Sequence, residues 1–165
     1  MQSCLIIDGY NALNKIKIFE SKKDINLEAA RLYLIRKLLD FLTCKKTFDK
    51  VFIVFDSKIQ DSSMKRHSYG KIEVIFSEAR KDADTTIVDM LRDLGPGYKI
   101  SVSSDDNFIK NHAKVYGATI ISVRELENLI MLKKKSSSSK INEKDLDESL
   151  VKDINEELRR YWRLK

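Results

Sequence analysis

Aspartates stand at or near the ends of three apolar, strand-like segments of this sequence. They are Asp8, Asp56 and the pair Asp105 and Asp106, and a further aspartate, Asp84, opens a helical pattern. An unpaired carboxylate at the end of a buried strand is costly unless a cation or hydrogen-bond donors compensate it, so such a residue often marks a site. For any single aspartate, a helix cap or a turn is an equally good explanation. The recurrence of the pattern favours a site.

Carboxylates gathered at one place repel one another, and either protonation or a divalent cation relieves the repulsion. Oxygen ligands without a cysteine or a well-placed histidine favour Mg²⁺ or Mn²⁺ over zinc. A hard cation held in this way suits phosphoryl chemistry, because it polarises the phosphate and lowers the pKa of a bound water. The sequence has no G-x-G-x-x-G or G-x-x-x-x-G-K-[ST] motif, and Tyr10 stands where an aspartyl-phosphate phosphatase has its second aspartate. A phosphodiester hydrolase fits what remains.

The composition bounds the class of protein. The chain has 165 residues, enough for one α/β domain, and a net charge of +6. A polyanionic partner would explain this charge, although a lysine-rich, AT-biased genome produces the same imbalance. Cys4 and Cys44 form no C-x-x-C motif, which indicates a reducing compartment. There is no apolar run of about 20 residues and no signal-peptide pattern, so we expect a cytoplasmic protein that does not enter a membrane.

Hydrophobic periodicity predicts alternating strands and helices. Strands are expected at residues 5–7, 51–55, 72–76, 98–102 and 118–122, and helices at 27–45, 83–94, 108–116 and 123–135. The polar segments 14–24 and 57–71 predict loops. After a serine-rich interruption at 136–139, apolar residues at helical spacing predict a last helix with a basic end. The expected division is therefore one domain at 1–135, followed at 136–165 by a linker and a basic helix packed on that domain.

The order of these elements indicates an α/β fold with a mostly parallel, five-stranded sheet and helices on both faces. Ligands of open α/β sheets bind beyond the carboxyl ends of the strands, where the strand order reverses. Asp8, Asp56 and the Asp105 and Asp106 pair belong to such ends, and Asp84 begins a helix that could reach the same rim. We therefore expect these carboxylates to meet at one edge of the sheet.

Basic residues gather in the polar segment 57–71. Lys65, Arg66 and Lys71 surround Tyr69. One interpretation is a solvated, mobile loop. The other is a loop that binds RNA, with the basic side chains on phosphates and Tyr69 available for stacking on a base.

Taken in order, the motifs resemble the YacP-like branch of the NYN domains, which are relatives of the PIN nucleases. The resemblance spans roughly residues 4 to 132, and the basic, tryptophan-bearing end of the chain is loosely similar too. It is carried by IIDGYN at 6–11, VFD at 54–56, VIFS at 74–77, AD at 83–84, VSSDD at 102–106, GA at 117–118 and SVREL at 122–126. Each motif alone is weak, whereas the ordered set is specific.

The resemblance implies a three-layer α/β/α PIN-like fold with a C-terminal helical extension, and the activity of a metal-dependent endoribonuclease. The best-understood members of the family are ribosome-associated enzymes that cut messenger RNA in the ribosomal A site. Carried across by position, Asp8 is implied as a metal ligand and Asn11 as a residue that orients a ligand, water or phosphate. Asp56 and Asp84 are implied as further acidic members.

The fourth acidic position is ambiguous. Counting back from Gly117 places the family's aspartate on Asp106 and its preceding serine on Asp105, so either residue could be the ligand, and we prefer Asp106. Asp82 replaces a non-acidic position of the family and is expected to cap a helix or to support the ligands. Arg31 matches a recurrent arginine of the family, for which a salt bridge is the plain interpretation and a phosphate contact the alternative.

The mechanism we expect is hydrolysis of an RNA phosphodiester by metal-activated water. One or two Mg²⁺ or Mn²⁺ ions would be held by Asp8, Asp84 and Asp106, with Asp56 acting directly or through water. No histidine is needed as a base, and lysines and arginines would track the RNA backbone. The expected partners are messenger RNA and the ribosome, and we expect a monomer. Two alternatives stay open: a non-catalytic RNA- or ribosome-binding module with a vestigial acidic site, and a phosphatase or nucleotide-hydrolysing enzyme.

Overall fold

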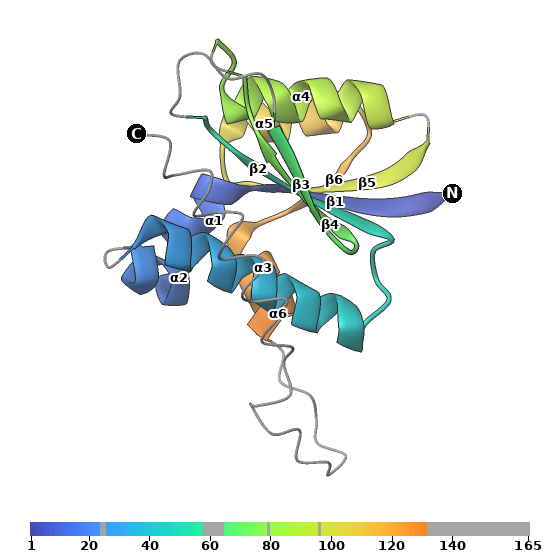
Figure 1. The fold of residues 1–165 in the computed structure, drawn as a ribbon. Coiled ribbons are helices and arrows are strands. Elements are labelled where there is room, and N and C mark those ends of the chain that lie inside the picture. Colours follow the sequence, from blue (N-terminus) through green and yellow to red (C-terminus); the bar gives the residue numbers. More distant parts are fainter. Residues whose placement is uncertain (24–25, 58–64, 79, 96, 132–165) are drawn as a thin grey trace. The chain divides into compact units, whose positions relative to one another are not determined.

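Six strands and six helices lie in the part of the chain that the computed structural model describes, residues 1–23, 26–57, 65–78, 80–95 and 97–131 (Figure 1). In chain order they are β1 (Gln2–Asp8), α1 (Gly9–Lys15), α2 (Lys17–Lys23), α3 (Leu27–Cys44), β2 (Lys50–Phe55), β3 (Lys65–Tyr69), β4 (Ile72–Phe76), α4 (Ala83–Leu94), β5 (Tyr98–Ser103), α5 (Asn107–Val115), β6 (Thr119–Ile121) and α6 (Val123–Met131). None of the helices in these ranges combines the length and the apolar character that a membrane span requires.

The strands form one sheet in the order β3-β4-β2-β1-β5-β6. β4, β2, β1, β5 and β6 run parallel, and β3 pairs antiparallel with β4 at the edge. The mostly parallel α/β fold is therefore confirmed, whereas the predicted count of five strands is wrong because β3 is an additional strand. The chain builds β2 and β4 on one side of β1 and then crosses to β5 and β6 on the other side. The strand order thus reverses between β1 and β5.

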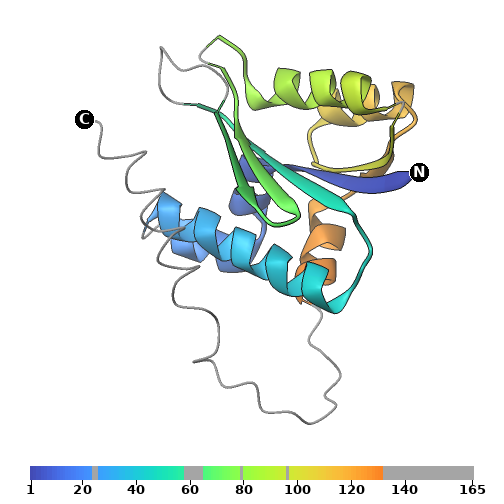
Figure 2. The same cartoon turned by 45° about the vertical axis from the view of Figure 1, so that its right-hand side comes forward.

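Helices cover both faces of this sheet (Figures 1 and 2). On one face, Leu5 and Ile7 of β1 pack in a core cluster with apolar residues of α1, α2, α3 and α6. On the other face, Ile6 of β1 and Val54 of β2 pack in a second cluster with residues of α4 and α5. Because successive residues of a strand point to opposite faces, a strand between two helical layers must be apolar throughout. This requirement explains the continuous apolar runs that precede Asp8 and Asp56.

The segment 57–71, expected as a loop, contains strand β3, so the loop prediction is wrong for residues 65–69. Its residues are mostly polar, as in a loop, because the strand lies at the edge of the sheet and alternates between partly buried and exposed residues. Its His67 ring meets the ring of Phe76 edge to face at 6.1 Å. Gly70 opens the two-residue turn into β4 with a φ of 60°, a left-handed conformation that favours glycine at the first position of such a hairpin.

Two short helices occupy most of the segment 14–24 that was also expected as a loop. Asp8 caps α1 directly after β1, and α2 begins after a single intervening residue, Ile16. The side chains of Ile16 and Phe19 are fully buried. Packing of these few apolar residues therefore holds a polar stretch in helical form, which is a tertiary effect that local polarity does not indicate.

The remaining predicted strands and helices up to residue 131 are confirmed, with differences of a few residues at their ends. The predicted last helix and the proposed linker at 136–165 lie outside the described residues. The division at residue 135 therefore stays a prediction.

Gly9 allows β1 to turn into α1 against the ring of Phe55. A Cβ atom on Gly9 would lie 2.3 Å from Cε1 of Phe55. The ring cannot easily give way, since it packs edge to face against Tyr10 at 5.4 Å and stacks on Phe76 at 5.7 Å. Gly9 thus allows the chain to pass directly from β1 into α1 after Asp8.

We expect Gly9→Ala to lower the free energy of unfolding by about 1–3 kcal/mol, the usual cost of overpacking a core. Alanine has a higher helix propensity than glycine, so a loss of stability in this variant would report the clash with Phe55. Urea denaturation measures the change. Gly97→Ala is the matched control, because its Cβ would come no closer than 3.8 Å to another residue. An unchanged unfolding midpoint for Gly9→Ala would contradict the packing described above.

Candidate active site

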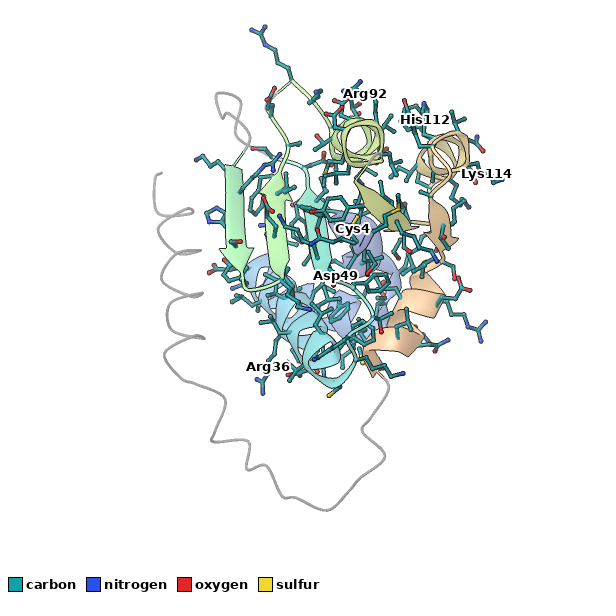
Figure 3. The ribbon with its side chains drawn as sticks, turned by 90° about the vertical axis from the view of Figure 1, so that its right-hand side faces the viewer. Cys4, Arg36, Asp49, Arg92, His112 and Lys114 are labelled. Atoms are coloured by element: carbon teal, nitrogen blue, oxygen red, sulfur yellow. The ribbon has the colours of Figure 1, made fainter. Side chains whose placement is uncertain are left out.

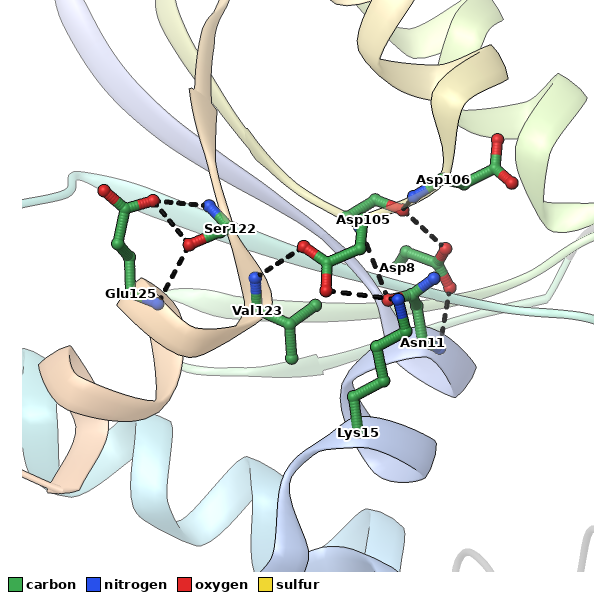
Figure 4. Close-up of polar contacts among 9 residues, drawn as sticks. Asp8, Asn11, Lys15, Asp105, Asp106, Ser122, Val123 and Glu125 are labelled. Atoms are coloured by element: carbon green, nitrogen blue, oxygen red, sulfur yellow. Dashed lines mark hydrogen bonds and ion pairs between the residues drawn. The ribbon is translucent and has the colours of Figure 1, made fainter.

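Asp8 lies where β1 ends and α1 begins, beside the point where the strand order reverses. Its side chain is only 6 % exposed. The backbone N–H of Asn11 donates to Oδ1 of Asp8 at 3.1 Å, and the hydroxyl of Ser104 donates to Oδ2 at 3.0 Å (Figure 4). Burial raises the pKa of Asp8 above its ordinary value, against the effect of these two hydrogen bonds, and the charges of Asp56 and Asp106 raise it further.

Ser104 links the ends of β1 and β5. Its Oγ donates to Asp8 and also accepts the backbone N–H of Asp106 at 3.1 Å. Ser104 is 1 % exposed, so this link is buried. The residue was not among the predicted site residues, and the signal in the sequence was its place in the VSSDD motif, two positions before a helix cap.

Three further aspartates approach the same edge from separate elements. Oδ1 of Asp106 caps α5 by accepting the N–H groups of Phe108 at 2.7 Å and Ile109 at 3.3 Å. Oδ1 of Asp56, directly after β2, accepts the N–H of Ala83 at 2.5 Å. Asp84 lies in the first turn of α4.

Asp82 has a different function from that of Asp84. It is the N-cap of α4, and its side chain accepts the backbone N–H of Thr85 at 2.7 Å. The contact with Thr85 lowers the pKa of Asp82. The geometry matches the capping role expected for this residue.

The four carboxylates of Asp8, Asp56, Asp84 and Asp106, which we call the acidic cluster, share one electrostatic environment. The pKa of Asp84 is raised to about 6, first by burial and then by the charges of Asp8, Asp106, Asp82 and Asp56. A carboxylate whose neighbours raise its pKa in this way gains from a proton or from a cation. The acidic cluster therefore has the electrostatics of a cation site.

The donor set of the acidic cluster suits a hard divalent cation, since every side chain offers carboxylate oxygens. However, within the described residues no three His, Cys, Asp or Glu side chains form a ready-made metal-binding group. One oxygen each of Asp8, Asp56 and Asp106 is engaged by the N-terminal end of a helix. Binding an ion would therefore require side-chain rotations around these hydrogen bonds.

Asp105 points away from the acidic cluster, although it is adjacent to Asp106 in sequence. Its carboxylate forms an ion pair with Lys15 at 3.2 Å and accepts the N–H of Val123 at 3.1 Å (Figure 4). Its own N–H donates to the side-chain oxygen of Asn11 at 3.4 Å. Partial burial would raise the pKa of Asp105, but Val123 and Lys15 lower it overall. The charge of Asp106, in contrast, raises the pKa of both Asp8 and Asp84. The choice of Asp106 as the ligand stays a prediction.

Arg31 is in the core and not at the surface. The side chain is 2 % exposed, and its guanidinium lies 4.9 Å from the ring centroid of Phe55 and 5.4 Å from that of Phe76. It also donates a hydrogen bond to the hydroxyl of Tyr10. Burial on this scale opposes the predicted RNA contact, and the position fits a residue that holds the aromatic rings behind Gly9.

The four basic and aromatic residues predicted to bind RNA are spread along the β3-β4 hairpin. Lys65 pairs with the last residue of β4, at the carboxyl edge of the parallel strands. Tyr69 pairs with Ile72, and the carbonyl of Lys71 accepts the N–H of Val51, so this turn lies at the opposite edge of the sheet. Arg66 forms an ion pair with Glu73 at 3.3 Å. Within this hairpin, the pairing places Lys65 alone among the four at the edge of the acidic cluster.

Comparisons with known proteins agree with this architecture. The family model of the YacP-like NYN domain matches residues 5–163. The chain is 30 % identical over 83 residues to the uncharacterized protein YacP of Bacillus subtilis (strain 168), a match that spans 50 % of this chain and 48 % of that protein. The chain thus matches about half the length of this relative.

Solved structures show the same fold. The crystal structure of Rae1 (YacP) from Bacillus subtilis is 23 % identical, with a TM-score of 0.63 over 96 % of this chain and 81 % of that chain. A mutant of the same protein gives a TM-score of 0.62 over 99 % of this chain and 85 % of that chain. The family model covers nearly the whole sequence. This protein therefore belongs to the YacP-like NYN domain family, within the PIN-like nuclease superfamily.

Proposed function

We propose that the protein is an Mg²⁺- or Mn²⁺-dependent endoribonuclease that hydrolyses RNA phosphodiester bonds at the acidic cluster. The observation that carries the proposal is the placement of Asp8, Asp56 and Asp106 at or just after the carboxyl ends of the neighbouring parallel strands β1, β2 and β5. Asp84 approaches from the first turn of α4, and burial followed by the charges of these aspartates and of Asp82 raises its pKa. Membership of a nuclease-type family supports the same reaction class. The strand order reverses between β1 and β5, and ligands of open α/β sheets bind at such a point.

Asp8, Asp84 and Asp106 are the proposed ligands of one or two ions, with Asp56 acting directly or through water. A divalent cation bound there would supply Lewis-acid chemistry, polarising the phosphate and lowering the pKa of the attacking water. Asn11 is proposed to orient a phosphate or water. Because its side-chain oxygen accepts the N–H of Asp105, the amide N–H₂ group is the end left to donate to substrate.

The proposed substrate is messenger RNA, cut in the A site of the ribosome. The proposed setting is the cytoplasm, with the protein acting as a monomer. The net charge of +6 supports an RNA partner, because phosphates dominate the affinity of nucleic-acid contacts. Lys15 and Lys65 are the proposed phosphate contacts nearest the acidic cluster. Lys15 is half exposed and lies beside Asn11 through its ion pair with Asp105.

A non-catalytic RNA- or ribosome-binding module is the second candidate. It is favoured by one observation, namely that Asp8, Asp56 and Asp106 each accept hydrogen bonds from helix N-termini. Such caps stabilise the fold without any ion. An activity assay separates the two candidates, because the module would bind RNA and leave it intact.

The first test is cleavage of labelled RNA, both free and bound to ribosomes, with Mg²⁺ or Mn²⁺ and with a chelator. We expect cleavage that depends on the metal. Asp8→Asn and Asp106→Asn should each lower the cleavage rate at least about 100-fold, while RNA affinity and the unfolding midpoint change little.

Asp105→Asn is the comparison for this test, because it removes a neighbouring carboxylate that lies outside the acidic cluster. We expect it to retain most of the activity. Full activity of Asp8→Asn, or cleavage that persists in the chelator, would reject the proposed mechanism. RNA that is bound but never cut would favour the second candidate, and released phosphate would indicate a phosphatase.

A second test uses the pH dependence of stability without metal. The pKa of Asp84 is raised in the folded protein, so its contribution to stability is complete below the ordinary value of 3.8 and is lost as the pH rises through about 6. We expect Asp84→Asn to become more stable relative to the wild type between about pH 4 and about pH 7. Thermal unfolding across this range measures the difference.

Asp82→Asn should behave in the opposite way, because the pKa of Asp82 is lowered by Thr85. The charged form of Asp82 stabilises the fold at pH values above the ordinary pKa of an aspartate, and this contribution is lost as the pH falls. Asp82→Asn should therefore be less stable than the wild type near neutral pH. Mn²⁺ should stabilise the wild type near neutral pH and stabilise Asp84→Asn less. If Asp84→Asn is less stable than the wild type near neutral pH without metal, the charge of Asp84 does not destabilise the fold, which would contradict its raised pKa.

A further inference from the structure

An exposed apolar stripe lies along α5. Among the described residues, four large apolar side chains are exposed, and three of them, Phe108, Val115 and Tyr116, belong to α5 or its C-cap. Phe108 is 49 % exposed and Tyr116 is 40 % exposed. The buried face of this helix is formed by Ile109 and Ala113 instead. The stripe is therefore not required for packing α5 on the sheet.

Phe108 and His112 form a fixed ring pair within this stripe. Their ring centroids are 4.3 Å apart with an interplanar angle of 51°, and Nδ1 of His112 lies 2.9 Å from the carbonyl oxygen of Phe108. His112 and Lys114 lie on the outer side of α5, away from the sheet (Figure 3). The contact with His112 restricts the ring of Phe108, which therefore offers an exposed aromatic face at little entropic cost.

The ring pair lies next to Asp106 of the acidic cluster. The N–H of Phe108 donates to the carboxylate of Asp106 at 2.7 Å, so the aromatic residue lies in the first turn of the helix that Asp106 caps. Lys110 and Lys114 lie on the same helix, and Lys110 is near enough to Asp105 to lower its pKa. An exposed aromatic side chain in the first turn of a helix that carries lysines, beside the proposed phosphodiester-cleaving site, matches the chemistry of a single nucleic-acid strand.

We propose that Phe108, backed by His112, is a stacking platform for an unpaired RNA base next to the phosphate at the acidic cluster. The inference rests on the proposed function, since it assigns the substrate strand a path over α5. It makes Phe108 a binding and positioning residue. Stacking of this kind tolerates any base, because every base has a π face.

The test uses short unpaired RNAs in which 2-aminopurine replaces one base at successive positions, bound to the Asp8→Asn protein so that they are not cut. One position should show quenched fluorescence through stacking. Phe108→Ala should abolish the quenching and weaken the Kd about tenfold, and Phe108→Tyr should retain both. Val115→Ala is the matched control, because it removes an exposed apolar side chain from the same helix that cannot stack, and should change neither.

An abasic nucleotide at the quenched position should weaken binding to the parent protein and have no further effect on Phe108→Ala. Equal binding of Phe108→Ala and the parent would overturn the inference. So would a lower unfolding midpoint of Phe108→Ala with unchanged RNA binding, because Phe108 would then be covered by protein. Fluorescence quenching does not require cleavage. If the wild-type protein cuts no RNA but quenching still depends on Phe108, the proposed nuclease activity is rejected and the proposed stacking is retained.

Discussion

Mutual repulsion of carboxylates at the carboxyl edge of the sheet is the constraint around which this fold is arranged. Asp8, Asp56, Asp84 and Asp106 come from four separate segments. Burial raises the pKa of Asp8, and the charges of Asp56 and Asp106 raise it further. Burial likewise raises the pKa of Asp84, and the charges of Asp8, Asp106, Asp82 and Asp56 add to the effect. Packing that brings like charges together is unfavourable unless something opposes the repulsion. The chain opposes it in part with the N-termini of its helices.

Capping and site formation are two aspects of the same geometry. Asp8 caps α1, Asp106 caps α5, and Asp56 accepts the first N–H of α4. The positive end of a helix dipole stabilises each of these anions. These hydrogen bonds hold one oxygen of Asp56 and one of Asp106, whereas both oxygens of Asp8 are engaged, the second by Ser104. The N-termini of these helices therefore stabilise the anionic side chains of the acidic cluster.

Residue order alone was sufficient to place Asp8 and Asp56 at the ends of strands, because strand ends can be located from apolar runs. It could not predict where the side chain of Asp105 points, since that depends on contacts with Lys15 and Val123, 90 and 18 residues away in the chain. The burial of Arg31 could not be predicted for a similar reason, because it depends on Tyr10, Phe55 and Phe76 converging in space. Strand β3 was missed because an edge strand needs few apolar residues.

The most direct measurement of the central claim is anomalous diffraction from crystals of the wild-type protein soaked in Mn²⁺ near neutral pH. The account predicts anomalous density between the carboxylates of Asp8, Asp84 and Asp106, with Asp105 still paired to Lys15. Density elsewhere on the protein, or an acidic cluster that stays without an ion at saturating Mn²⁺, would contradict the claim that these aspartates are gathered to hold a cation.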